Sequence, residues 1–138
     1  MKGLPTLIRL RRQELDEKRR SLNDLEQAEN LLAHRIQSLD EEVKHEQEFA
    51  GGSEEVRFAY ENFAAAAKVR REGLVDALTA QRVLVEEARE EVSEAFREFK
   101  KLDIAEQNNR RRAEEESERR DRIAADEIGL EIHRRANR

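Results

Sequence analysis

The sequence predicts an all-α fold, a long two-helix antiparallel coiled-coil hairpin with a C-terminal helical overhang. Of its 138 residues, 43% are charged and 37% are hydrophobic. This hydrophobic content is too low for an ordinary globular core but is sufficient for a seam between two helices. Apolar residues recur at alternating steps of three and four in two segments, as on one face of a helix. A Gly-Gly-Ser sequence separates these segments and marks the turn of the hairpin.

The first helix is predicted over residues 4–49. Pro5 fits its first turn, where the missing N–H would have no partner in any case. Polar residues such as Glu29 interrupt the seam and keep the helix soluble. The apolar a and d positions of its heptads are Leu15, Leu22, Leu25, Leu32, Ile36, Leu39 and Val43.

The turn is predicted at residues 50–53, and the second helix from residue 54 to about 135. Ser53 has the side chain of an N-cap, and Glu54 and Glu55 place negative charge in the first turn. Gly73 lies inside this helix and predicts a close approach of the facing helix or a bend. The predicted seam of this helix is Tyr60, Phe63, Ala67, Leu74, Leu78, Gln81, Val85, Ala88, Val92, Ala95, Phe99 and Leu102.

The two seams predict a register when the chain folds back at the glycine pair. Facing residues then have numbers that sum to about 103, so that Leu25 lies opposite Leu78 and Leu22 opposite Gln81. The second seam fades after Leu102, where the first helix has no residues left to face it. We therefore predict one domain over residues 1–138, with residues 103–138 overhanging the hairpin as a helix supported by Glu and Arg side chains three and four apart.

Motifs for chemistry are missing from the sequence. There is no cysteine and no glycine-rich phosphate loop, and the three histidines, His34, His45 and His133, do not have the spacing of metal ligands. The many carboxylates belong to charged helical faces without the buried pocket that acid and base catalysis needs. The expectation is a protein that is no enzyme, with no cofactor, no metal and no small-molecule substrate.

Charge is uneven along the chain. The first twenty residues carry seven Lys and Arg against three Asp and Glu, a basic end that suits an acidic opening in a partner and would make a weak membrane anchor. The arginines after residue 106 are balanced by acids, and the whole chain has a net charge of −5 and a pI near 5.4. Nucleic acid is therefore not an expected partner. The apolar stretch from Leu4 to Leu10 is too short for a signal peptide or a membrane span.

Aromatic side chains gather around the predicted turn, although only 4% of the chain is aromatic. A seam between two helices cannot bury four rings, so some must be exposed as anchors for a partner. The four are Phe49, Phe58, Tyr60 and Phe63.

A resemblance to a known family adds to this interpretation. The chain opens with MKGLPTLIRLRRQELDEKRRSLNDLEQAE and continues after a glycine turn with FAYENFAAAA, and in both it resembles the FliJ family, the coiled-coil stalk of the flagellar type III export ATPase complex. The resemblance implies a non-catalytic cytoplasmic hairpin, peripheral at the inner membrane through its partners. It implies three partners: the hexameric export ATPase, the cytoplasmic domain of the membrane export gate, and export chaperones.

The resemblance also implies where the partners bind. The end formed by the termini would enter the pore of the ATPase ring, and the hairpin region would contact the gate. His45, Leu74 and the acidic Glu42 depart from the residues expected near the gate contact. The ATPase-binding candidates are Leu4, Leu7, Arg9, Arg11, Arg12, Arg110, Arg111 and Arg112. The gate-binding candidates are Phe49, Tyr60, Phe63 and Ala67.

Two alternatives remain open at the level of sequence. One is a generic dimeric coiled-coil adaptor, in which the seams pair between two chains. The other is the equivalent stalk of an injectisome, which would share the architecture and differ in the ATPase it serves.

Overall fold

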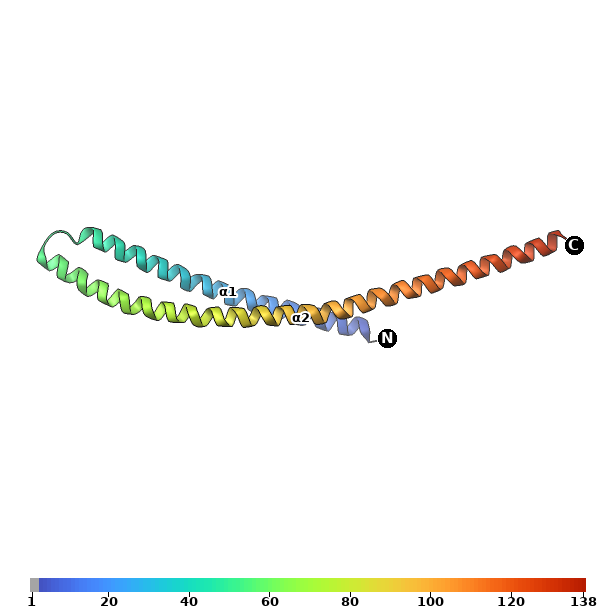
Figure 1. The fold of residues 1–138 in the computed structure, drawn as a ribbon, viewed down its shortest axis with the longest axis horizontal. Coiled ribbons are helices and arrows are strands. Elements are labelled where there is room, and N and C mark those ends of the chain that lie inside the picture. Colours follow the sequence, from blue (N-terminus) through green and yellow to red (C-terminus); the bar gives the residue numbers. More distant parts are fainter. Residues whose placement is uncertain (1–2) are drawn as a thin grey trace. The chain divides into compact units, whose positions relative to one another are not determined.

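The computed structural model describes residues 3–138, which form two helices joined by a short turn. Helix α1 spans Leu4–Phe49 and helix α2 spans Glu54–Ala136 (Figure 1). The helices run antiparallel and pack against each other, and no strand occurs among the described residues. The prediction of an all-α helical hairpin is confirmed.

The start of α2 is capped as the sequence predicts. The amide of Val56 donates to the Ser53 side-chain oxygen over 3.3 Å, and the amide of Arg57 donates to the Ser53 carbonyl over 3.1 Å. Neither Gly51 nor Gly52 has a positive φ, and a Cβ added at either would meet no atom within 4 Å. The glycines therefore end α1 through their low helix propensity, because the turn does not require a backbone that only glycine adopts.

Removing the cap should have a measurable cost. Ser53→Ala is expected to destabilise the hairpin by about 1 kcal/mol, because the Val56 amide loses its acceptor. Urea unfolding followed by circular dichroism measures this loss. Ser93→Ala is the control, since Ser93 is exposed inside α2 and alanine should raise stability there by about 0.5 kcal/mol. Equal effects of the two substitutions would show that the Ser53 cap contributes nothing.

The chain divides into two compact units, and both helices contribute to each. One unit is Glu14–Ala95, and the described part of the other is residues 3–13 with 96–138. In the unit Glu14–Ala95, every predicted seam residue is buried or half-buried. Val85 is the most deeply buried, with 1% of its surface exposed. The buried residues of this unit are Leu15, Leu39, Ala67, Leu78, Val85 and Ala88.

The predicted register needs a correction. The side-chain amide of Gln81 donates to the backbone carbonyl of Leu25 over 3.0 Å, three residues along α1 from Leu22, its predicted neighbour. Side chains on a helix lean towards its N-terminus, and in an antiparallel pair the two helices lean in opposite directions. The numbers of two contacting residues therefore add up to more than about 103, the sum predicted by folding the chain about the centre of the turn.

Ion pairs between the helices flank the seam of this unit. Arg71 contacts Asp40 over 2.8 Å, Lys18 contacts Glu91 over 3.1 Å, and Arg82 contacts Glu29 over 3.4 Å. The hydrogen bond to Asp40 is the main reason that the pKa of Arg71 is raised above its ordinary value. Because most of these groups are well exposed to water, they favour this alignment of the helices more than they add to stability.

Of the two alternatives predicted for Gly73, a close helix approach is wrong, and a bend stays a prediction. Gly73 is exposed, and a Cβ added there would meet no atom within 4 Å. The residue faces solvent beside the seam residue Leu74, so the interior glycine weakens α2 without serving a contact.

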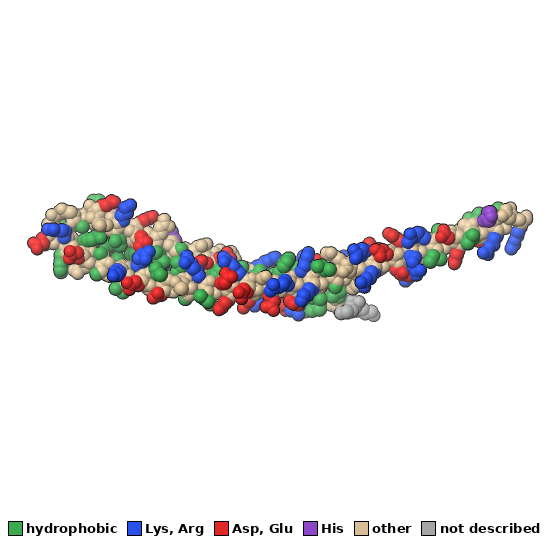
Figure 2. All heavy atoms as spheres, in the orientation of Figure 1, with side chains coloured by type: hydrophobic (Ala, Val, Ile, Leu, Met, Phe, Trp, Pro, Cys, Tyr) green, Lys and Arg blue, Asp and Glu red, His purple; other side chains and the backbone are tan. Residues whose placement is uncertain are grey.

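In the second unit, residues 3–13 of α1 pack against the part of α2 that follows Ala95. Leu4 is 4% exposed, and the guanidinium of Arg12 lies 5.4 Å from the centre of the Phe99 ring. The cation and the ring attract each other in this geometry. Within this unit α2 continues to Ala136, and from residue 111 onward every side chain except that of Glu116 is exposed. Figure 2 shows acidic and basic side chains interspersed along residues 113–138, which we call the overhang from here on.

Candidate functional site

The second unit contains a strongly basic surface, which we call the basic end and define as residues 3–13 and 96–112. It carries nine Lys and Arg against three Asp and Glu, a net charge of +6. The unit Glu14–Ala95 carries eleven Lys and Arg against 21 Asp and Glu, a net charge of −10. The acidic total of the chain therefore conceals a local excess of positive charge.

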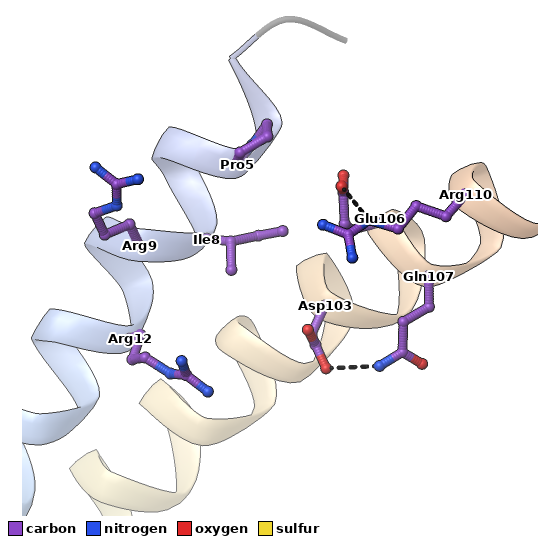
Figure 3. Close-up of a pocket in the computed structure, with 8 residues that line it drawn as sticks. All are labelled: Pro5, Ile8, Arg9, Arg12, Asp103, Glu106, Gln107 and Arg110. Atoms are coloured by element: carbon purple, nitrogen blue, oxygen red, sulfur yellow. Dashed lines mark hydrogen bonds and ion pairs between the residues drawn. The ribbon is translucent and has the colours of Figure 1, made fainter. Parts of the chain in front are cut away.

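An open groove lies between α1 and α2 at the basic end (Figure 3). Ile8 points from α1 across the groove, and the guanidinium of Arg12 is directed towards α2. Arg110 contacts Glu106 over 3.1 Å on the α2 side. The side-chain amide of Gln107 donates to Asp103 over 3.1 Å. The lining residues are Pro5, Ile8, Arg9, Arg12, Asp103, Glu106, Gln107 and Arg110.

The structure brings together some of the eight predicted ATPase-binding residues and separates others. Arg9, Arg12 and Arg110 line the same groove although Arg110 lies about one hundred residues after the other two in sequence. Leu4 is buried and stabilises the helix pair, so its side chain offers little surface to a partner. The remaining four also belong to the basic end: Leu7 and Arg11 are half-buried, Arg111 is exposed and donates to Asn108 over 3.2 Å, and Arg112 lines a hollow with overhang residues.

A second candidate surface lies at the turn, within the unit Glu14–Ala95. Phe49 and Phe58 are 68% and 66% exposed, which is unusual for phenylalanine. The ring of His45 contacts Phe49 edge-on, with ring centres 4.7 Å apart. Figure 2 shows hydrophobic side chains gathered over this end of the hairpin. A groove here, which we call the turn surface, is lined by Glu46, Phe49, Ala50, Val56, Ala59, Tyr60 and Phe63.

Three of the four predicted gate-binding residues share the turn surface. Phe49, Tyr60 and Phe63 line one groove, whereas Ala67 is 7% exposed and lines a separate hollow with Leu39. Ala67 is thus mainly a seam residue. Sequence reasoning missed Val56, which is 44% exposed at the edge of the groove. Its spacing of four from Tyr60 and seven from Phe63 was the available signal.

Four arginines of the overhang contact acids of the overhang itself. Glu116 contacts Arg119 over 2.9 Å and Arg120 over 3.5 Å, and Glu131 contacts both Arg134 and Arg135. The hydrogen bond from Arg119 is the main cause that lowers the pKa of Glu116 below its ordinary value. These local pairs, three and four residues apart, support an isolated helix.

The described residues contain no group of three or more His, Asp or Glu side chains placed to hold a metal ion. In the same residues, no helix is long and apolar enough to cross a bilayer. Both candidate surfaces are open grooves without a buried ionisable group.

The sequence was compared with family models, curated proteins and solved structures. A family model described as "Flagellar FliJ protein" matches residues 1–138, the full length of the sequence. No curated protein and no solved structure matches the chain.

Proposed function

Because the chain belongs to the flagellar FliJ family, whose role is in flagellar export and is not catalytic, we propose that it is the coiled-coil stalk of the flagellar type III export apparatus. In this proposal the basic end binds the hexameric export ATPase. The turn surface contacts the cytoplasmic domain of the export gate and receives export chaperones. The protein thereby links the ATPase to the gate.

The observation that carries the proposal is the basic end. Its net charge of +6 is concentrated where the first residues of α1 meet α2, while the unit Glu14–Ala95 is acidic. Such a local excess steers the basic end into an acidic opening of a partner. The acidic unit Glu14–Ala95 would be repelled by the same opening. The guanidinium groups of Arg12 and Arg110 extend towards one groove, and that of Arg9 lies on its outer side; all three suit carboxylates on a ring of subunits.

The turn surface supports the second contact in the proposal. Exposed aromatic side chains beside a groove are typical anchors in protein interfaces, because a ring buries a large area at a small entropic cost. Phe49 stands at the edge of this groove and is held by the edge-on contact with His45. A partner that covers the groove would bury Phe49 and Val56 together.

The test of the function is reconstitution with two ATPases. The purified chain should stimulate ATP hydrolysis by the flagellar export ATPase and promote formation of its ring, and it should restore motility to a strain that lacks the protein. The same assay with an injectisome ATPase separates the two systems. Stimulation of the injectisome enzyme alone, or of neither enzyme, would overturn the proposal.

The turn surface can be tested with a single substitution. Phe49→Ala is expected to weaken capture of the gate's cytoplasmic domain about tenfold, since truncation of an aromatic anchor typically costs more than 1 kcal/mol of binding free energy. Val69→Ala is the control, because Val69 is 70% exposed in the same unit but does not line the groove. Stability should change little in either variant. Equal capture of the gate's cytoplasmic domain by Phe49→Ala and by the native chain would contradict the assignment of the gate contact to the turn surface.

A generic dimeric adaptor is the alternative function. The contact between Gln81 and Leu25 and the ion pairs beside it can form within one chain, so the hairpin does not require a second copy. Light scattering distinguishes the two, since a hairpin has the 16.2 kDa mass of one chain and a dimeric adaptor has the mass of two chains.

A further inference from the structure

One face of α2 at the basic end is basic and is turned away from α1. Positions 97, 101, 104, 108 and 111 follow each other at steps of four and three, which places them on a single helical face. Lys100 lies beside this row. The opposite side of the same helix carries Phe99, Leu102 and Glu106, which are half-buried. We call this face the outer face, with Phe96 at its edge; its exposed residues are Phe96, Arg97, Lys100, Lys101, Ile104 and Arg111.

Little negative charge opposes the cations of the outer face. The stretch 96–112 has three acids, and two of them, Asp103 and Glu106, lie in the groove with Arg9 and Arg12. The third, Glu98, contacts Lys101 over 3.5 Å. Within the described residues, Arg97 and Lys100 form no ion pair.

The overhang shows the contrast on the same helix. There Arg119, Arg120, Arg134 and Arg135 each contact an acid three or four residues away. On the outer face, Arg97 and Lys100 make no such contact within the described residues, so an external anionic surface would find their charge available.

Two large apolar side chains accompany the cations: Ile104 lies among them, and Phe96 borders the face about 100° around the helix from Arg97. Phe96 is 43% exposed and Ile104 is 46% exposed, and Lys100 lies midway between them. Lys and Arg around exposed apolar side chains on one helix face are typical of helices that lie on a membrane surface. A nucleic acid would use the cations but leave both apolar side chains in water.

We propose that the outer face binds anionic phospholipid headgroups directly, with Phe96 and Ile104 entering the interface between headgroups and acyl chains. This inference goes beyond the proposed function, because it requires neither the ATPase nor the gate. With two apolar side chains the attachment is weak and reversible, so it raises the concentration of the protein at the membrane without fixing it there.

The experiment is co-sedimentation of the full chain with lipid vesicles. Vesicles of phosphatidylcholine mixed with phosphatidylglycerol should bind the protein, and vesicles of phosphatidylcholine alone should not. Raising the salt concentration should release it, because exposed charges are screened. Equal binding to both kinds of vesicle, or binding to neither, overturns the proposal. This includes a preparation that the ATPase captures but that never sediments with vesicles.

Matched variants locate the binding on the chain. Arg97→Gln, Lys100→Gln and Lys101→Gln together should lower the vesicle partition coefficient on the order of a hundredfold, about fivefold for each charge. Arg19→Gln, Arg20→Gln and Arg35→Gln together remove the same charge from exposed positions in the unit Glu14–Ala95 and should have little effect. An equal loss in this control set would mean that net charge, and not the outer face, governs binding.

A second pair of substitutions tests the apolar part. Phe96→Ser with Ile104→Ser should also reduce binding while helicity, followed by circular dichroism, stays close to that of the native chain. Unchanged binding would overturn insertion of these side chains. Stimulation of the ATPase is measured on the same preparations, so that a failure of lipid binding and a failure of the proposed function are seen separately.

Discussion

Val85→Asp is expected to separate α1 from α2 within the unit Glu14–Ala95, whereas Val83→Asp should leave the pairing intact. Val85 is 1% exposed in the seam, and Val83, two residues away on the same helix, is 54% exposed. An aspartate at position 85 would place an unpaired carboxylate between apolar side chains, which should cost at least about 3 kcal/mol. Thermal and urea unfolding, followed by circular dichroism, measure the difference.

The control is closely matched because both substitutions make the same chemical change in the interior of one helix. Any loss of helix propensity and any effect of net charge are therefore shared. What differs is burial. If the two variants unfolded at the same temperature, the seam at Val85 would not stabilise the hairpin.

Replacing Arg9, Arg11 and Arg12 together with glutamate is expected to abolish stimulation of the export ATPase. The three reversals take the basic end from a net charge of +6 to zero, which removes its attraction to an acidic opening. ATP hydrolysis by the ATPase is measured with native and variant chains at several salt concentrations, because the native stimulation should itself weaken as salt rises.

Two controls separate charge at the basic end from other effects. Glutamate at Arg19, Arg20 and Arg35 makes the same overall charge change in the unit Glu14–Ala95 and should preserve stimulation. Glutamine at Arg9, Arg11 and Arg12 avoids new repulsion with Asp103 and Glu106 in the groove, and should still reduce stimulation. Full activity of the glutamate variant at the basic end would contradict the assignment of this surface to the ATPase.

The sequence was sufficient to predict the seam because the seam is local and periodic. Leu39, Leu78 and Val85 are buried where steps of three and four place them on one face of a helix. The cap was predictable for the same reason, since Ser53 and the Val56 amide are three residues apart. Contacts within one turn of helix depend on spacing alone.

Features that depend on alignment between the helices were harder to predict. Gln81 contacts Leu25 because of the lean of side chains, which a count from the turn ignores. Gly73 faces solvent. Its spacing from the seam residues was not sufficient to exclude a contact with α1. Leu4 was a binding candidate by resemblance, yet it is buried, because only the folded pair shows which residues at the basic end cover one another.

The candidate site shows the same division. Composition alone predicts the positive charge of the first residues. The grouping of Arg9 and Arg12 with Arg110 depends on α2 packing beside the first residues of α1. The outer face needed both kinds of information. The spacing of Arg97 and Lys101 places them on one side of α2, and the structure supplies the exposure and the ion pairs that leave this side positively charged.

The hydrogen bond from Gln81 to the Leu25 carbonyl has a consequence for how the family's length can vary. If one arm alone gained a heptad between this bond and the turn, the amide would meet a different stretch of the other helix, and the hydrogen bond could survive only if the turn absorbed the extra residues. Insertions of seven residues in both arms, on the turn side of this bond, would preserve it. Natural changes in length are therefore expected as balanced pairs, or as longer and shorter turns.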